Sequence, residues 1–169
     1  MQREISFFMV IMVLLFMLTG CTERSSENPA IDRAEFSQID YGKAICEFEH
    51  VVIDEFRYGG KLETKSGDVF TFMSVECLAG YYLNNLNESQ IKNMWVTDFN
   101  HGKMLIPVEE AVFLHSKNRK SPNGLNLTAL KADDEKITFN MRFAYGGDLI
   151  GWEEVLQLVQ KEWNINRKI

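Results

Sequence analysis

The sequence predicts an α+β domain made of two small lobes of ββαβ type, with an amphipathic helix at the C-terminus. Three observations carry this prediction. Two β-prone runs flank a turn signal at 66–68, a helical pattern follows them, and the second half of the chain loosely repeats that order of segments. We place the first lobe at 41–104 and the second lobe, with the final helix, at 105–169.

The first lobe begins with two strands, because β-prone residues at 55–65 and 69–73 are joined by the turn signal Ser-Gly-Asp. Ser74 is a suitable N-cap for a helix that runs to residue 86. Apolar residues fall on one stripe of this helix, namely Val75, Leu78, Ala79, Tyr82 and Leu86. A third strand at 94–99 alternates apolar and polar residues and completes the order ββαβ.

The second half supplies a comparable series of elements. Extended segments are predicted within 104–116, with Pro107 at an irregular or edge position, and "LNLTAL" at 125–130 is strand-like. A helix over 131–145 ends at Gly146-Gly147, and a short strand follows at 148–150. The last helix is the clearest, because Trp152, Val155, Leu156, Val159 and Trp163 share one face.

The N-terminus has the pattern of an export signal. Arg3 precedes an apolar run of fourteen residues, Ile5 to Leu18, which is too short to span a membrane comfortably. The run ends in "LTGC", which resembles a bacterial lipobox, so we expect a signal peptide at 1–20 and lipidation of Cys21, for example by palmitate. Residues 21–40 are then a flexible tether. An uncleaved anchor is the alternative, and both interpretations place the domain outside the cytoplasm, in the cell envelope and facing the periplasm.

Composition and motifs exclude several classes of function. The net charge of −6 argues against a nucleic-acid partner, because phosphate binding requires a basic surface. The chain has no Gly-x-Ser-x-Gly elbow, no phosphate loop and no His-Glu-x-x-His motif. We therefore expect that the protein is not an enzyme.

The remaining candidate site is a metal site built from soft ligands. Cys46 and His50 lie four positions apart in "CEFEH", and Cys77 lies in the first predicted helix. In an extended strand Cys46 and His50 would be about 13 Å apart, so they share a metal only if the segment turns. Thiolate suits Cu(I), and imidazole suits copper or zinc. Two alternatives stay open: a buried thiol beside a surface histidine, and a disulfide between Cys46 and Cys77.

The order of several short motifs resembles the NosL family. The motifs are Cys-x-Phe at 46–48, Glu-Cys-Leu at 76–78, Val-x-Asp-Phe at 96–99, and Gly-Gly at 146–147 followed by Trp-Glu-Glu at 152–154. The resemblance extends over 45–159 and includes the lipobox. It implies two ββαβ lobes, distantly like the organomercurial lyase fold. It also implies a lipid-anchored copper chaperone that delivers Cu(I) to a periplasmic cuproenzyme, with nitrous-oxide reductase or its maturation transporter as partner.

The metal motif departs from the family pattern, which typically opens with Cys-x-x-Cys-x-Met. Cys46 keeps the first position, whereas Glu49 and Val51 stand where the second Cys and the Met are expected. Asn123 stands where a Met often follows Ser-Pro in related sequences. The resemblance thus implies Cys46 as the anchoring thiolate of a Cu(I) site, His50 as second ligand, and Cys77 or a methionine as third.

Two further hypotheses follow from the same resemblance. The departures from the metal motif favour a metal-free interaction module of the same fold, acting in envelope protein assembly. An enzyme of the organomercurial-cleaving type would need paired thiols with an acid, and no local spacing supports it.

Overall fold

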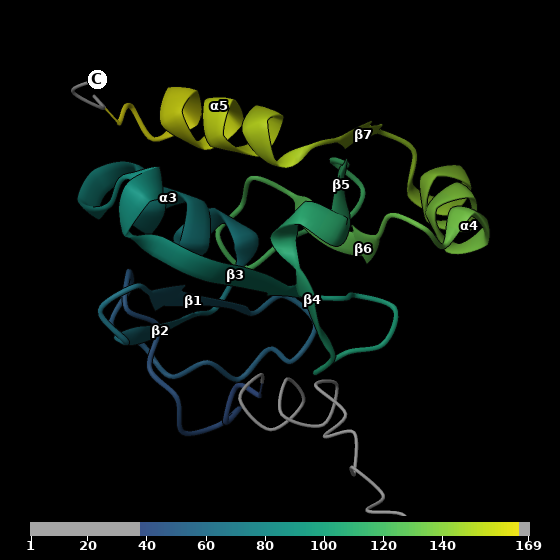
Figure 1. Ribbon diagram of the computed structural model, residues 1–169. Helices are drawn as coiled ribbons and strands as arrows, with labels where there is room; N and C mark the ends of the chain where they lie inside the picture. Colours follow the sequence, from purple (N-terminus) through teal and green to yellow (C-terminus); the bar gives the residue numbers. More distant parts are fainter. Residues whose placement is uncertain (1–37, 166–169) are drawn as a thin grey trace, which may run out of the picture. The chain divides into compact units, whose positions relative to one another are not determined.

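The structure is a computed structural model that describes residues 38–165. The predicted signal peptide, the predicted lipidation at Cys21 and the tether up to residue 37 lie outside the described residues. Within the described part, no helix is long and apolar enough to cross a membrane. The predicted α+β class is confirmed, because two small antiparallel sheets and three helices make up the domain (Figure 1).

The first sheet has the strand order β2-β1-β3-β4. Its strands are β1 (Gly60–Thr64), β2 (Val69–Phe72), β3 (Ile91–Thr97) and β4 (Leu105–Pro107). Helix α3 (Val75–Asn85) connects β2 to β3, and a 3-10 turn, Glu88–Gln90, precedes β3. The predicted order ββαβ is confirmed. Strand β3 starts three residues before its predicted beginning, because Ile91 already pairs with Thr64 on β1.

The second sheet has the strand order β6-β5-β7. Its strands are β5 (Ala111–His115), β6 (Leu127–Lys131) and β7 (Asp148–Ile150), and helix α4 (Glu135–Tyr145) connects β6 to β7. The chain order β5-β6-α4-β7 repeats that of β1-β2-α3-β3, and in both sheets the first strand of the unit lies between the other two. The predicted repeat is therefore present in topology as well as in sequence.

The extended run around Pro107 serves both sheets. Residues 105–107 pair with β3 in the first sheet, a 3-10 turn follows at Val108–Glu110, and Ala111 begins the second sheet. Proline lacks the N–H that a central strand would need, which suits its place at the end of the short outer strand β4. The run therefore passes the chain from one sheet to the other.

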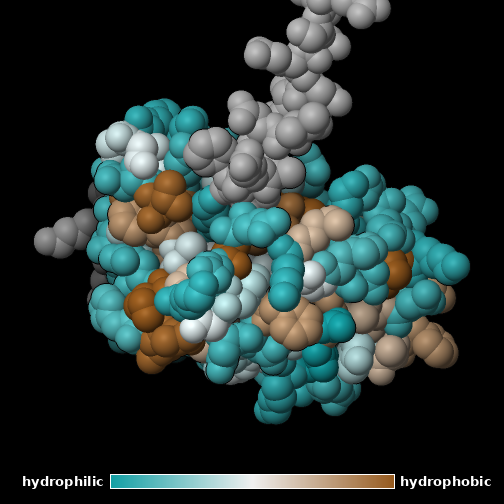
Figure 2. All heavy atoms as spheres, turned by 90° about the horizontal axis from the view of Figure 1, so that it is seen from below, coloured by the Kyte–Doolittle hydropathy of each residue, from teal (hydrophilic) through white to brown (hydrophobic). Residues whose placement is uncertain are grey.

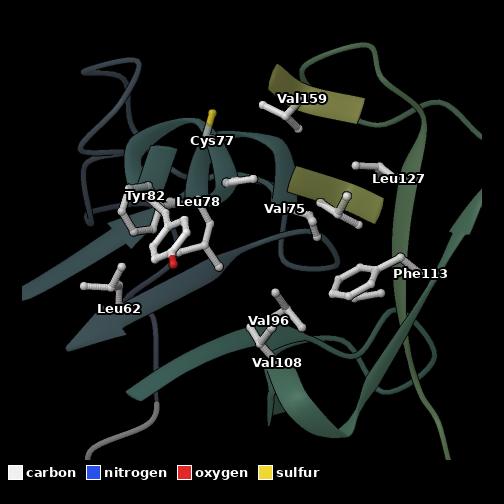
Figure 3. Close-up of a cluster of buried hydrophobic side chains, with 14 of the residues drawn as sticks. Leu62, Val75, Cys77, Leu78, Tyr82, Val96, Val108, Phe113, Leu127 and Val159 are labelled. Carbon is white, nitrogen blue, oxygen red and sulfur yellow. The ribbon is translucent and has the colours of Figure 1, made fainter. Parts of the chain in front are cut away.

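One large core joins the two sheets. Figure 3 shows side chains from α3, α5 (Trp152–Glu162) and strands of both sheets meeting in it. The predicted apolar face of the last helix is confirmed, since Val155, Leu156 and Val159 are buried. A smaller core lies between β5, β6 and the inner side of α4. The second sheet is buried on both faces, which explains why four of the five residues of β6 are buried.

A glycine allows the closest approach between α3 and its neighbours. A Cβ built on Gly80 would lie 2.6 Å from Cζ3 of Trp163 and 3.1 Å from Cε2 of Phe48. Phe48 and Trp163 stack with ring centroids 5.3 Å apart and an interplanar angle of 14°. The stacked rings thus lie over the glycine of α3. This contact fixes the position of residues 46–50 relative to the helix.

A buried carboxyl group ties α3 to the second lobe. Glu76 is fully buried in the first turn of α3, and its Oε1 accepts hydrogen bonds from the hydroxyl of Ser121 and from the N–H of Leu127, the latter at 3.5 Å. Its Oε2 has no partner among the described residues. Burial raises the pKa of Glu76, because the charged form loses its hydration, although these hydrogen bonds act in the opposite direction.

We predict that Gly80→Ala destabilises the domain by about 1–2 kcal/mol through overpacking against Trp163. Alanine otherwise favours a helix by about 0.5–1 kcal/mol relative to glycine. The substitution should therefore become neutral or stabilising in a Trp163→Ala background. Chemical denaturation of the four proteins in this double-mutant cycle measures the coupling. An equal effect of Gly80→Ala in both backgrounds would contradict the packing argument.

We also predict that Glu76→Gln changes the pH dependence of stability. The pKa of Glu76 is raised above its ordinary value of 4.5 in the folded protein. Its contribution to stability is therefore complete below about pH 4.5 and declines as the pH rises through the folded pKa. Glutamine keeps the acceptor and cannot ionise. Glu76→Gln should exceed the wild type by about 1–3 kcal/mol at pH 8 and match it near pH 4. Urea denaturation at both pH values measures the free energy of unfolding. The same difference between Glu76→Gln and the wild type at pH 4 and pH 8 would refute the prediction.

Candidate metal centre

Residues 46–50 form a tight turn rather than an extended strand. The N–H of His50 donates to the carbonyl oxygen of Cys46 at 2.8 Å, and the N–H of Cys46 donates to the carbonyl oxygen of Val51 at 2.8 Å. His50 has a φ of 57°, the left-handed conformation that closes such turns. The N–H of Glu47 donates to Thr71 of β2 at 2.9 Å, which holds the turn against the outer strand of the first sheet. The segment therefore turns in the way that a shared ligand set would require.

The turn places the Cys46 sulfur in a group of hydrogen-bond donors. Cys46 is fully buried, and its pKa is lowered from 9.0 to about 6, mainly because the thiol of Cys77 donates to its sulfur. Burial opposes this shift, while the backbone N–H groups of Glu49, Met73 and Phe48 add to it. The lowered pKa favours the thiolate of Cys46, which is the form that binds soft metals.

Cys77 comes to the same point from the first turn of α3. Ser74 caps this helix as predicted, with its hydroxyl oxygen accepting from the N–H of Cys77 at 3.1 Å. The pKa of Cys77 is raised, because its thiol is hydrogen-bonded to the Cys46 sulfur and is buried. Both thiols are free, so the disulfide alternative is not the state of this structure. The protonated form of Cys77 is therefore favoured beside Cys46.

Asn123 forms the third side of the centre. Its Oδ1 accepts from the hydroxyl of Ser74 at 2.6 Å. It also lies 3.2 Å from the Cys77 sulfur, where it competes with the Cys46 sulfur for the one S–H proton of Cys77. Its Nδ2 donates to Oε1 of Glu49 at 3.3 Å. The amide thus links the turn, the N-terminus of α3 and the loop at 121–124, segments that are far apart in the sequence.

Glu76 supports the loop that carries Asn123, through its hydrogen bond with Ser121. Ser121 also accepts from the N–H of Asn126 at 2.8 Å, so the loop is held at both ends. The sequence indicated Ser74 as a helix cap and Asn123 as a departure from a family motif. It gave no sign that Glu76 would position the loop, because a glutamate in the first turn of a helix is usually solvated.

His50 is placed differently from the two cysteines. Its side chain is exposed and forms no hydrogen bond or ion pair with another described residue. The structure brings Cys46 and Cys77 together and leaves the imidazole on the solvent side of the turn. Among the described residues, no three His, Cys, Asp or Glu side chains form a group that could hold a metal ion. His101 pairs with another residue instead: its Nδ1 lies 2.5 Å from Oδ2 of the buried Asp98.

The arrangement suits a soft, low-coordinate ligand. It offers two thiol sulfurs and one amide oxygen, and imidazole and carboxylate groups lie on the exposed side of the turn. An open hollow of about 370 Å³ lies next to these segments, lined in part by Met73, Ser121 and Pro122. Hard cations prefer several oxygen ligands, which this centre lacks.

Known proteins share the fold of this chain. The chain is similar to the crystal structure of the copper chaperone NosL from Shewanella denitrificans, with 23% sequence identity and a TM-score of 0.58. The match covers 68% of this chain and 91% of that chain, and it shows a common fold. No curated protein gave a significant match. The family model NosL matches residues 40–159, which is most of the chain. The protein therefore belongs to the NosL family.

Proposed function

We propose that this protein binds Cu(I) at Cys46 and Cys77 and passes it to a periplasmic cuproenzyme. The observation that carries the proposal is the meeting of two buried free thiols at the N-terminus of α3, where hydrogen bonds lower the pKa of Cys46. The similarity to a copper chaperone of the same fold supports it.

The ionisation of the pair explains how the ion would bind. Cys46 presents a thiolate before the metal arrives, and Cys77 releases its proton when a cation takes the place of that proton between the two sulfurs. Two thiolates satisfy Cu(I), which accepts low coordination numbers and prefers sulfur. The oxygen of Asn123 is a poor ligand for Cu(I), so the two thiolates leave a third coordination position unfilled. His50 on the exposed side of the turn is our choice for that position.

The location and the recipient are proposals from the sequence. Lipidation of Cys21 would anchor the protein in the cell envelope, with the domain facing the periplasm. Membership of the NosL family supports nitrous-oxide reductase, or the transporter that takes part in its maturation, as the recipient.

A second candidate is a metal-free interaction module of the same fold. The hydrogen bonds of Asn123 favour it, because they satisfy both Ser74 and Cys77 without any ion. In that case the thiol pair would serve packing alone.

We predict that the mature chain binds one Cu(I) in anaerobic competition with a chromophoric chelator. Cys46→Ser and Cys77→Ser should each weaken binding by at least about 100-fold, more than the 10–100-fold typical of lost outer-shell partners. His50→Ala should have a smaller effect, because its side chain is exposed. His101→Ala is the matched control and should leave binding unchanged, since its ring is paired with Asp98. A wild-type protein with reduced thiols that fails to compete would favour the metal-free module.

We further predict that Asn123→Met strengthens Cu(I) binding by about tenfold or more, because it puts a soft thioether where an amide oxygen lies 3.2 Å from the Cys77 sulfur. Asn123→Leu is the control, since it removes the same hydrogen bonds and has a similar size but no sulfur. The same chelator competition measures both. Equal affinities for the methionine and leucine variants would mean that residue 123 does not contact the ion.

A further inference from the structure

The two ββαβ units differ in how their helices are covered. In the first unit, α3 packs under α5, with Trp163 against Gly80 (Figure 1). In the second unit, the corresponding helix α4 packs through Ile137, Thr138 and Met141 on its own sheet. Among the described residues, no helix covers the opposite face of α4.

That outer face of α4 carries two aromatic residues. The exposed fractions of Phe139 and Phe143 are 66% and 84%, the highest of all the large apolar residues described. They lie four positions apart on the helix and stack with ring centroids 6.3 Å apart. Figure 2 shows several apolar patches on a mainly hydrophilic surface on the face drawn there. The stacked pair on α4 differs from the other exposed apolar residues in the larger exposed fractions of its two rings.

Basic residues accompany the two phenylalanines. Helix α4 carries Lys136 and Arg142 against a single acid, Glu135, in a chain whose net charge is −6. Neither Lys136 nor Arg142 takes part in an ion pair with another described residue. Aromatic rings beside unpaired cations are typical of helices that lie at the boundary between lipid headgroups and acyl chains.

Both ends of α4 are fixed, so this face is a stable feature of the surface. Asp134 caps the first turn by accepting from the N–H of Ile137 at 3.0 Å. At the other end, the carbonyl oxygen of Tyr145 accepts from Ser116 at 2.7 Å and from Asn118 at 2.9 Å. A helix held in this way presents its outer residues as a unit.

We propose that the Phe139–Phe143 face of α4 rests on the surface of the bilayer that holds the lipid anchor. This inference depends on the lipidation of Cys21 in the proposed function. Sixteen residues separate Cys21 from the first described residue, Gln38, and they reach at most about 55 Å even when fully extended. Such a tether keeps the domain at a high effective concentration near the membrane, so two aromatic side chains and two cations suffice to orient it.

The test uses the full lipidated protein in vesicles of phosphatidylethanolamine and phosphatidylglycerol. Phe143→Trp places a fluorescent reporter on the proposed face, and Val69→Trp places one at another exposed apolar position, 52% exposed on β2. Emission of the added tryptophan is measured by difference from the parent protein. With acyl chains brominated, we expect the residue-143 reporter to be quenched at least about twofold more than the residue-69 reporter.

Three outcomes would overturn the proposal. Equal quenching of the two reporters, in protein whose intact mass includes the lipid, refutes the orientation and leaves the anchor and the copper site intact. An intact mass without lipid refutes the lipid anchor, and this proposal fails with it. Cu(I) competition tests the metal centre independently of the anchor. A dimer in detergent that Phe139→Ser with Phe143→Ser abolishes would assign the face to a second copy of the chain.

Discussion

The stacking of Phe48 and Trp163 over Gly80 is the contact on which the rest of the centre depends. Without a Cβ at residue 80, α3 accepts both rings at van der Waals distance, and the turn at 46–50 is held beside the helix. This turn brings Cys46 to the N-terminus of α3, where Cys77 and the backbone N–H of Met73 form hydrogen bonds with its sulfur. Packing, helix geometry and thiol chemistry are therefore linked through one glycine.

The electrostatics of the centre follow from its burial. Two thiols that share a dry site resist ionising together, and here the pKa of Cys46 is lowered while that of Cys77 is raised. A cation that binds between the two sulfurs removes this restriction. Asn123 occupies the remaining side and links it to Glu49 through its amide. The departures from the family motif thus form a connected hydrogen-bond network, which gives the centre a defined shape before any ion arrives.

The repeat in the fold has two consequences. The turn at 46–50 is held against β2 of the first ββαβ unit, which also supplies α3, whereas the loop with Asn123 belongs to the second unit, so the centre requires both units. The large core shared by the two sheets and the hydrogen bond between Glu76 and Ser121 fix the position of the Asn123 loop relative to α3. The helix α5 covers α3 and leaves α4 open on its outer side. The same asymmetry that covers α3 therefore leaves the aromatic face of α4 exposed.

The sequence by itself determined the elements and the residue types. Its period-2 and period-3.6 patterns predicted the ββαβ order, the cap at Ser74 and the buried face of the last helix, because those features depend on neighbours in the chain. It also selected Cys46, His50 and Cys77 as soft ligands. Only the tertiary structure decided which of them meet. Cys46 and Cys77 lie about thirty residues apart, and Asn123 lies farther still, so their contact depends on packing across two lobes. The burial of Glu76 and the donors from Cys77 and Met73 that lower the pKa of Cys46 likewise depend on distant segments, which no local pattern contains.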